Sequence, residues 1–300
     1  MGKTNNINYL SVATQDLRQV AGPQSQVTTT ADVSIVLNGD ASKRLYVREG
    51  QVYQLAEPRL ILVTKGTAEV NLNLEHCSLG PGKVVLTTPD MILEPIRFDA
   101  GISISGIVFK DDIHVGESIV ADLSPRDFGQ MVRMLYLLHD VATQEPYRRD
   151  TVRQLVTAMI SNLSYIKDAA AGDDAAPAAT RAQQLFQQFK TLVNKHCTEE
   201  RNIPFYARRL SVSPHHLSAV VSHASGHSVM YWLNRAVLLR AKVLLRNSDL
   251  MTYEIAYRLH FNNPPAFNNF FKRETGMTPK AYRCNTDGRA GSVYTSAISP

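Results

Sequence analysis

Hydrophobic side chains recur at helical spacing through the last third of the chain, from Ile203 to Arg283. In the second half of this stretch one buried stripe ends at Leu259, and a sharp turn follows. Asn263 can then cap a new helix that has a proline in its first position. The next stripe consists of phenylalanines at helical spacing: Phe267, Phe270 and Phe271. Gly276 is placed to end that helix. A helix, a tight turn and a polar helix form a helix-turn-helix motif.

The same pattern occurs once upstream. Asn202 can cap a short helix, and Ser213 can cap the helix that follows a turn at Ser211 and Val212. Between the two copies, residues 229–245 are apolar on more than one face, which predicts a central helix buried by both motifs. A rigid connector of this kind can hold two polar helices about 34 Å apart, one turn of duplex DNA.

From about Thr180 to Arg283 the chain resembles the DNA-binding domain of the AraC/XylS family of transcription regulators. The resemblance is carried by Ala207, Leu210, Ser213, Leu217, Gly226, Arg240, Ala241, Lys242, Leu244, Leu245, Glu254, Ile255, Ala256, Phe261, Phe267, Phe271, Lys272, Gly276, Thr278, Pro279, Tyr282 and Arg283. It implies two recognition helices in successive major grooves, usually upstream of a promoter.

Four features depart from the family pattern. His260 stands where the family usually has glycine, so it is expected to adopt a positive φ, which histidine tolerates better than most residues. Val237 replaces a usual arginine, and Met251 replaces a usual capping serine. The first recognition helix is short of lysine and arginine. A protein that occupies one half-site and acts mainly as a docking factor therefore stays an alternative.

The positive charge is concentrated in the same region. Residues 181–283 carry 15 basic and 5 acidic side chains, whereas residues 1–180 carry 16 basic and 21 acidic ones. The last third alone therefore has the positive electrostatic field that would attract a polyanion. The first residues lack a signal-peptide stretch, and no apolar run reaches membrane-spanning length. The three cysteines are scattered, so we expect a cytoplasmic protein without a membrane partner.

Each predicted contact residue has a stated chemistry. Cations that meet phosphates should supply most of the affinity, and short polar side chains on the recognition helices should read bases. The expected phosphate contacts are Arg208, Arg209, Lys272, Arg273, Lys280 and Arg283. The expected polar groups are His215, Ser218, Ser222 and His223 in the first helix and Asn263, Asn268 and Asn269 in the second. Asparagine can pair bidentately with adenine.

The chain from Val33 to about Phe109 has the alternation of short strands, which predicts a sandwich or a small barrel. Residues 59–64 and 67–74 flank Lys65-Gly66, which reads as a two-residue hairpin turn. A second turn at Gly80-Pro81-Gly82 precedes another strand. In front of an AraC-like domain, this pattern is similar to the cupin-like sensor barrel of the family. A barrel of this size can hold one small ligand.

A metal-dependent cupin enzyme is the alternative for this region. Such enzymes take their ligands from a His-x-His pair, a nearby Glu and a later His, whereas this sequence offers Glu69, Glu75, His76 and a distant His114. Adjacent strand positions point to opposite faces, so Glu75 and His76 do not easily reach one ion. No metal, no other cofactor and no catalytic residue are predicted.

Two helices should follow the strands. Ser124 can cap the first. The second, from about residue 146 to residue 169, has apolar side chains at heptad spacing. They are Val152, Val156, Met159, Leu163 and Ile166. This stripe can pack on the chain's own strands or pair with a second copy, and the family resemblance favours a homodimer.

The predicted fold class is a two-domain α+β protein. We expect a cupin-like β-barrel regulatory domain at 1–123 that binds a small-molecule effector, and a dimerising helical pair at 124–169. A linker at 170–179, an all-α DNA-binding domain at 180–284 and a disordered tail at 285–300 follow. The predicted function is a sequence-specific transcription regulator, an activator, that binds double-stranded DNA; RNA polymerase is a further candidate partner. The alternative is a cupin-like enzyme fused to a DNA-targeting module.

Overall fold

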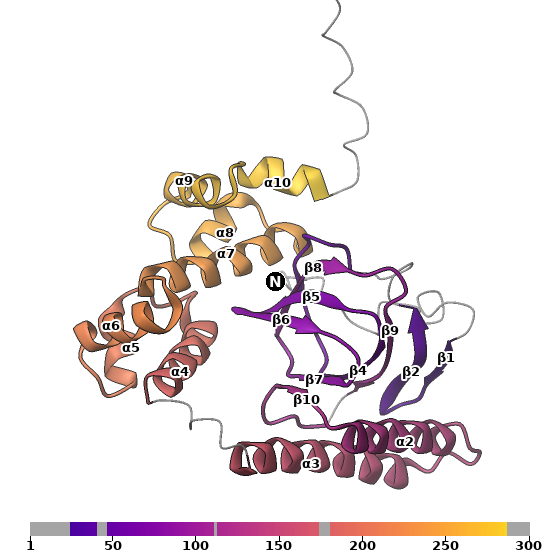
Figure 1. Ribbon diagram of the computed structural model, residues 1–300. Coiled ribbons are helices and arrows are strands. Elements are labelled where there is room, and N and C mark those ends of the chain that lie inside the picture. The colour runs from indigo at the N-terminus through magenta and orange to yellow at the C-terminus, as the bar shows by residue number, and fades with distance from the viewer. Residues whose placement is uncertain (1–24, 41–46, 111–112, 174–180, 287–300) are drawn as a thin grey trace, which may run out of the picture. The chain divides into compact units, whose positions relative to one another are not determined.

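The computed structural model describes residues 25–40, 47–110, 113–173 and 181–286, which belong to two compact units (Figure 1). The sheet unit, residues 25–173, contains two antiparallel sheets followed by two helices. The helical unit, residues 181–286, is formed by helices alone in its described part. The predicted order of a β-rich region before an all-α region is confirmed.

Two sheets of antiparallel strands build the first unit. The larger has the order β1 (Gln26–Thr29), β2 (Val33–Asp40), β9 (Ser103–Phe109), β4 (Arg59–Lys65), β7 (Lys83–Thr87) and β10 (Ile119–Asp122). The smaller has the order β3 (Tyr53–Gln54), β8 (Ile92–Phe98), β5 (Ala68–Leu72) and β6 (Glu75–Leu79). Val63 and Val85 of the larger sheet share a core with Val70 and Leu72 of the smaller. The strands therefore form a double-layered sandwich, and the cupin-like assignment stays a prediction.

The hairpin predicted at Lys65-Gly66 is wrong. β4 pairs with β7 and β9, whereas β5 pairs with β6 and β8, so the chain passes from one sheet to the other at this point. Gly66 has a φ of 68°, and a Cβ on it would lie 2.7 Å from the Cα of Ile102. The strand expected over 67–74 ends at Leu72. Asn73, with a φ of 54°, then leads back into β6.

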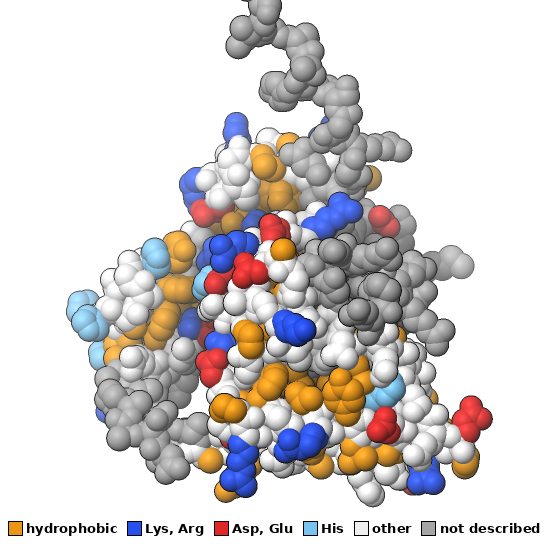
Figure 2. Space-filling model, turned by 45° about the vertical axis from the view of Figure 1, so that its right-hand side comes forward, with side chains coloured by type: hydrophobic (Ala, Val, Ile, Leu, Met, Phe, Trp, Pro, Cys, Tyr) orange, Lys and Arg blue, Asp and Glu red, His pale blue; other side chains and the backbone are white. Residues whose placement is uncertain are grey.

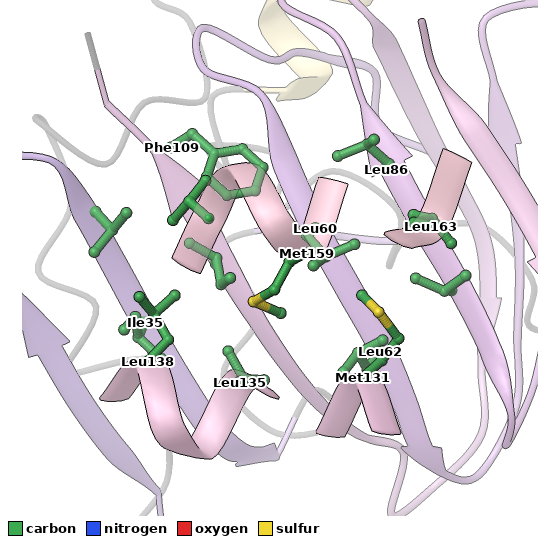
Figure 3. Close-up of a cluster of buried hydrophobic side chains, with 14 of the residues drawn as sticks. Ile35, Leu60, Leu62, Leu86, Phe109, Met131, Leu135, Leu138, Met159 and Leu163 are labelled. Atoms are coloured by element: carbon green, nitrogen blue, oxygen red, sulfur yellow. The ribbon is translucent and has the colours of Figure 1, made fainter. Parts of the chain in front are cut away.

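The two helices of the sheet unit cover the outer face of the larger sheet (Figures 1 and 3). They are α2 (Pro125–Ala142), which Ser124 caps as predicted, and α3 (Arg149–Asp173). In Figure 3, Met159 of α3 lies beside Leu60 of the larger sheet, and Met131 of α2 lies beside Leu62. Four of the five predicted stripe residues of α3 are fully buried there: Val152, Val156, Met159 and Leu163. The stripe therefore packs on the chain's own sheet, and the use of this stripe for dimerisation is wrong.

A buried carboxylate fastens the start of α3 to the sheets. Asp32, only 1% exposed, accepts a hydrogen bond from Arg149 Nε at 3.0 Å and one from the Tyr147 hydroxyl at 2.9 Å. Arg153 lies 3.6 Å from the same carboxylate. Arg149 is 57% exposed, so solvent screens part of its attraction to Asp32, whereas the carboxylate itself is buried and needs its partners. The placement of α3 is therefore fixed by charge as well as by apolar packing.

Several expectations fall at the edges of the described residues. α3 extends to Asp173, so the segment expected as a linker from residue 170 begins inside a helix. Residues 285 and 286, which were expected in a disordered tail, form the end of the last helix. The rest of that tail and the rest of the linker lie outside the described residues, as do residues 1–24.

Seven helices make up the described helical unit (Figure 1). Their bounds are α4 (Arg181–His196), α5 (Ile203–Arg209), α6 (Pro214–Ser225), α7 (Val229–Asn247), α8 (Thr252–Arg258), α9 (Pro264–Thr275) and α10 (Pro279–Thr286). The central helix α7 packs against α4, α6, α8, α9 and α10. Its buried side chains lie on more than one face, as predicted, and Val237 is one of them. Val237, which stands where the family usually has arginine, is therefore part of the apolar core.

Candidate nucleic-acid interface

Two helix-turn-helix motifs, α5–α6 and α8–α9, are capped in the same way. Ser213 Oγ accepts a hydrogen bond from the His216 N–H at 3.1 Å, and Asn263 Oδ1 accepts one from the Ala266 N–H at 2.8 Å. Both second helices begin with proline and end at a left-handed glycine, Gly226 or Gly276. Each side-chain cap satisfies a backbone donor that helix formation would otherwise leave unpaired.

The tight turns of the two motifs also correspond. Ser211 has a φ of 57° and His260 has a φ of 53°, which confirms the positive φ predicted for His260. The imidazole Nδ1 of His260 lies 2.8 Å from the carbonyl oxygen of Thr198. The hydrogen bond between the His260 ring and Thr198 therefore helps to hold the second turn in a left-handed conformation, which is unfavourable for most residues other than glycine.

The first helix of the second motif starts without the usual capping serine. At its N-cap, Met251 makes no side-chain hydrogen bond, but its N–H donates to Glu254 Oε2 at 2.7 Å. This is one half of a capping box, and it satisfies the backbone donor at the cap. The substitution by methionine therefore leaves α8 with a cap of its own.

Long-range contacts fix the motifs to the central helix. The indole N–H of Trp232 on α7 donates to Ser225 Oγ at the end of α6, at 3.0 Å. Arg283 on α10 donates to the carbonyl oxygens of Leu245 and Leu250, each at 2.7 Å. Arg283 was expected to contact phosphate, but here it joins α10 to the end of α7.

Sequence reasoning missed Arg201, which performs a similar task. Its guanidinium lies 3.8 Å from the centroid of the Phe261 ring and donates to the carbonyl oxygen of Leu259. Burial lowers the pKa of Arg201. Arg201 thereby links the segment before α5 to the turn of the second motif. Its position in an irregular segment carries no periodic signal that could have revealed this contact.

α9 presents an exposed polar face opposite its phenylalanines. Asn268, Asn269 and Lys272 are exposed, whereas Phe267, Phe270 and Phe271 are buried. Arg273 is also exposed, and its Nη2 lies 2.7 Å from Glu274 Oε1. The side-chain oxygen Oδ1 of Asn263 already accepts the N-cap hydrogen bond from the Ala266 N–H. The exposed amides and the lysine on this helix have the chemistry for base edges and phosphate, respectively.

α6 presents a face of different chemistry. His215, Ser222 and His223 are exposed, while the hydroxyl of Ser218 donates to the Pro214 carbonyl oxygen at 2.9 Å. The sequence of α6 contains neither lysine nor arginine. In Figure 2, pale-blue histidine side chains gather over this part of the helical unit. The imidazoles and hydroxyls of this face can donate and accept hydrogen bonds, so its chemistry suits base edges.

The remaining predicted cations lie outside the recognition helices. Arg208 and Arg209 are exposed at the end of α5, and the Arg209 guanidinium lies 4.9 Å from the centroid of the Phe205 ring. Lys280 is exposed on α10. Arg240 instead donates to the Asn194 carbonyl oxygen at 3.5 Å, which ties α7 to α4. Arg208, Arg209 and Lys280 are thus accessible to a phosphate backbone.

The sheet unit shows no comparable site among its described residues. His76 Nε2 lies 3.2 Å from Glu69 Oε2, and the Ser78 hydroxyl donates to Glu69 Oε1 at 2.9 Å. His114 is exposed between β9 and β10. Within the described ranges, no group of three or more histidine, cysteine, aspartate or glutamate side chains could hold a metal ion.

Comparison with known proteins identifies the helical unit. Residues 206–285 match a family model described as a helix-turn-helix domain. The chain is 32% identical over 93 residues to the HTH-type transcriptional activator RhaS of Escherichia coli O139:H28, strain E24377A. That alignment covers 31% of this chain and 34% of RhaS, so the chain spans about a third of the length of the curated relatives it matches.

Solved structures give partial likenesses. The C-terminal domain of AraT, a response regulator from Geobacillus stearothermophilus, is 27% identical over 40% of this chain and 97% of that one, with a TM-score of 0.34. Unsaturated fatty acid bound ToxT from Vibrio cholerae strain SCE256 is 13% identical over 88% of this chain and 99% of that one, with a TM-score of 0.39. Neither TM-score reaches 0.5, so the assignment rests on the sequence matches and on the motifs themselves.

The helical unit is therefore a helix-turn-helix domain. Its two motifs flank α7, and part of it is similar in sequence to the transcriptional activator RhaS. In the described residues, no helix combines the length and apolar character that crossing a membrane needs.

Proposed function

We propose that the chain is a sequence-specific DNA-binding transcription regulator that activates transcription. The observation that carries this proposal is the pair of matched motifs, each of which presents an exposed polar helix from a common central helix. The similarity of this region to transcriptional activators named RhaS supports the direction of regulation. The cytoplasm, where bacterial DNA lies, is the proposed location, and no cofactor or membrane is required.

Contacts are assigned by chemistry and exposure. Lys272, Arg273, Arg208, Arg209 and Lys280 meet phosphates. Asn268 and Asn269 read base edges from α9, and the candidate groups of α6 are His215, Ser218, Ser222 and His223. Asn263 shapes the entry of α9 as its cap. Arg283 is left out of the proposed interface, because its guanidinium is bonded to two backbone carbonyls within the domain.

The sheet unit is assigned the regulatory role. We propose that it binds a small-molecule effector and contributes to a homodimer, with RNA polymerase as a further partner of the DNA-bound protein. Because the apolar stripe of α3 is buried on the sheet, a dimer needs another surface. The outward sides of α2 and α3 expose Leu137 and Tyr165, at 50% and 72%. Exposed apolar side chains of this size are the proposed contact points.

Two substitutions on α9 test the proposal. Asn269→Ala should relax preference at one base pair and cost about 1–3 kcal/mol on the matched site, with the salt dependence nearly unchanged. Lys272→Ala should weaken matched and scrambled DNA alike and lower the salt slope by about one. The measurement is the Kd on both DNAs from about 50 to about 200 mM salt. Lys195→Ala, an exposed lysine on α4, is the matched control and should leave the slope unchanged.

The same experiment can contradict the assignment. Identical behaviour of the two variants on matched and scrambled sites would show that the reading and the electrostatic roles are not separated as proposed. Failure of the parent chain to prefer any sequence would overturn the function itself.

A cupin-like enzyme fused to a DNA-targeting module is the alternative. This alternative is supported by the pairing of Glu69 on β5 with His76 on β6, because glutamate and histidine side chains can both bind metal ions. Metal analysis of the purified chain separates the two functions. Stoichiometric iron, zinc or manganese would favour the enzyme, whereas a regulator of the proposed kind needs none.

A further inference from the structure

The first turn of α9 has no backbone donor available for phosphate. Helix N-termini ordinarily present free N–H groups that bind anions. Here Pro264 and Pro265 have no N–H, and the Ala266 N–H donates to Asn263 Oδ1 at 2.8 Å. The Phe267 N–H donates to the Asn263 carbonyl oxygen at 3.4 Å. All four positions of the turn are therefore without a free donor.

The surface of the same turn is apolar and exposed. Pro265 and Ala266 are both exposed to solvent. Pro265 precedes Asn268, Asn269 and Lys272 by three, four and seven residues, so these four side chains lie along one face of the helix. This is the face opposite the buried phenylalanines. The proline therefore leads the row of side chains that the proposed function directs to DNA.

The N-terminal residues of a recognition helix are those that contact base edges in the major groove. Most groups on those edges are hydrogen-bond donors or acceptors, and an apolar side chain would leave them unsatisfied. The exception is the C5-methyl group of thymine, which accepts apolar contact. An exposed proline at this point therefore suits thymine better than any other unmodified base.

We propose that Pro265 is a specificity-determining residue that recognises a thymine C5-methyl group. The inference rests on the proposed function and deepens it, because it names the base chemistry read beside Asn269. Four residues of helix correspond to about 6 Å along its axis, and duplex DNA rises about 3.4 Å per base pair. The thymine should therefore lie within about two base pairs of the position that depends on Asn269.

Replacement of single thymines by deoxyuridine tests this contact, because the change removes only the methyl group. The full chain is first used to select a preferred site from random-sequence duplexes, and Asn269→Ala locates the base pair read by that residue. Each nearby thymine is then replaced in turn. One replacement should weaken binding by about fourfold, the value of one buried methyl group. The others should have little effect.

A substitution of Pro265 completes a double-mutant cycle between this residue and the thymine methyl group. Pro265→Ser removes most of the apolar surface, so the sensitive thymine and its deoxyuridine counterpart should bind that variant equally. Pro214→Ser is the matched control, since Pro214 occupies the first turn of α6 and is exposed. It should leave the fourfold loss intact. The circular dichroism spectrum of each variant checks that its helices are preserved.

The outcomes separate the inference from the function on which it rests. Sequence-specific binding by the parent chain without a sensitive thymine within about two base pairs would overturn the role of Pro265 and leave the regulator standing. A fourfold loss that persists in Pro265→Ser would also overturn it. Absence of any preferred sequence would instead overturn the proposed function.

Discussion

The two recognition helices share one scaffold and differ in the chemistry they expose. α6 and α9 are each 12 residues long, begin with proline behind a capping side chain and end at a left-handed glycine. Yet α9 carries exposed Lys272 and Arg273, whereas α6 contains no lysine or arginine and exposes imidazoles and hydroxyls. The two helices therefore share a backbone design and differ in their binding chemistry.

The largest expected effect tests whether the two motifs share one core. Phe271 in α9 and Leu217 in α6 are both fully buried, and both helices pack on α7. Phe271→Ala should destabilise the helical unit by about 3–5 kcal/mol and Leu217→Ala by about 2–5 kcal/mol. Trp232 is the only tryptophan of the chain and lies on α7, so its fluorescence during denaturation reports this unit.

The distant substitution is the decisive one. If the motifs form one cooperative core, Phe271→Ala should move the Trp232 transition although Trp232 contacts the first motif through Ser225. An unmoved fluorescence transition, with a shifted transition in circular dichroism, would show that the second motif unfolds separately.

An intermediate effect tests the histidines of α6. Their exposed imidazoles can donate and accept hydrogen bonds at base edges. A variant with His215→Ala and His223→Ala should therefore weaken binding to the matched site by about 1–3 kcal/mol and leave binding to scrambled DNA nearly unchanged. The measurement is the Kd on both DNAs at one salt concentration.

Lys272→Ala provides the comparison from α9, because it should weaken matched and scrambled DNA alike. A histidine variant that also weakens both DNAs equally would remove the proposed difference between the helices.

Much of the helical unit could be predicted because its signals are local. Caps, prolines and terminal glycines act over a few residues, and the phenylalanine stripe of α9 follows from helical period alone. The positive φ of His260 was predicted from the family resemblance, in which glycine usually holds this position. The contacts of Arg201 and Arg283 could not be foreseen, because each joins segments that only the folded chain brings together.

The sheet unit shows where a periodic pattern is ambiguous. A strand, a glycine and a second strand look alike whether the chain folds into a hairpin or passes to another sheet, and at Gly66 it passes to another sheet. Heptad spacing in α3 likewise describes a buried stripe without saying what buries it. The partner was the larger sheet of the same chain, fixed in part by Asp32.

The smallest expected effect compares the two tight turns. Ser211→Gly removes a side chain from a left-handed conformation, which ordinarily costs about 1–2 kcal/mol for residues other than glycine. Glycine adds about 0.5–1 kcal/mol of conformational entropy to the unfolded state, so a net stabilisation of about 0.5–1 kcal/mol is expected. His260→Gly gives the same backbone relief but also removes the imidazole contact with the Thr198 carbonyl oxygen.

A hydrogen bond of this kind contributes about 0.5–1.5 kcal/mol, so His260→Gly should leave the free energy of unfolding nearly unchanged. Both values come from denaturant titration followed by Trp232 fluorescence. Equal stabilisation by the two substitutions would mean that the imidazole contributes nothing to the second turn. The left-handed backbone of His260 would then be strain that the fold tolerates. A clear difference between the two substitutions would instead show that the hydrogen bond of the His260 ring offsets this backbone strain.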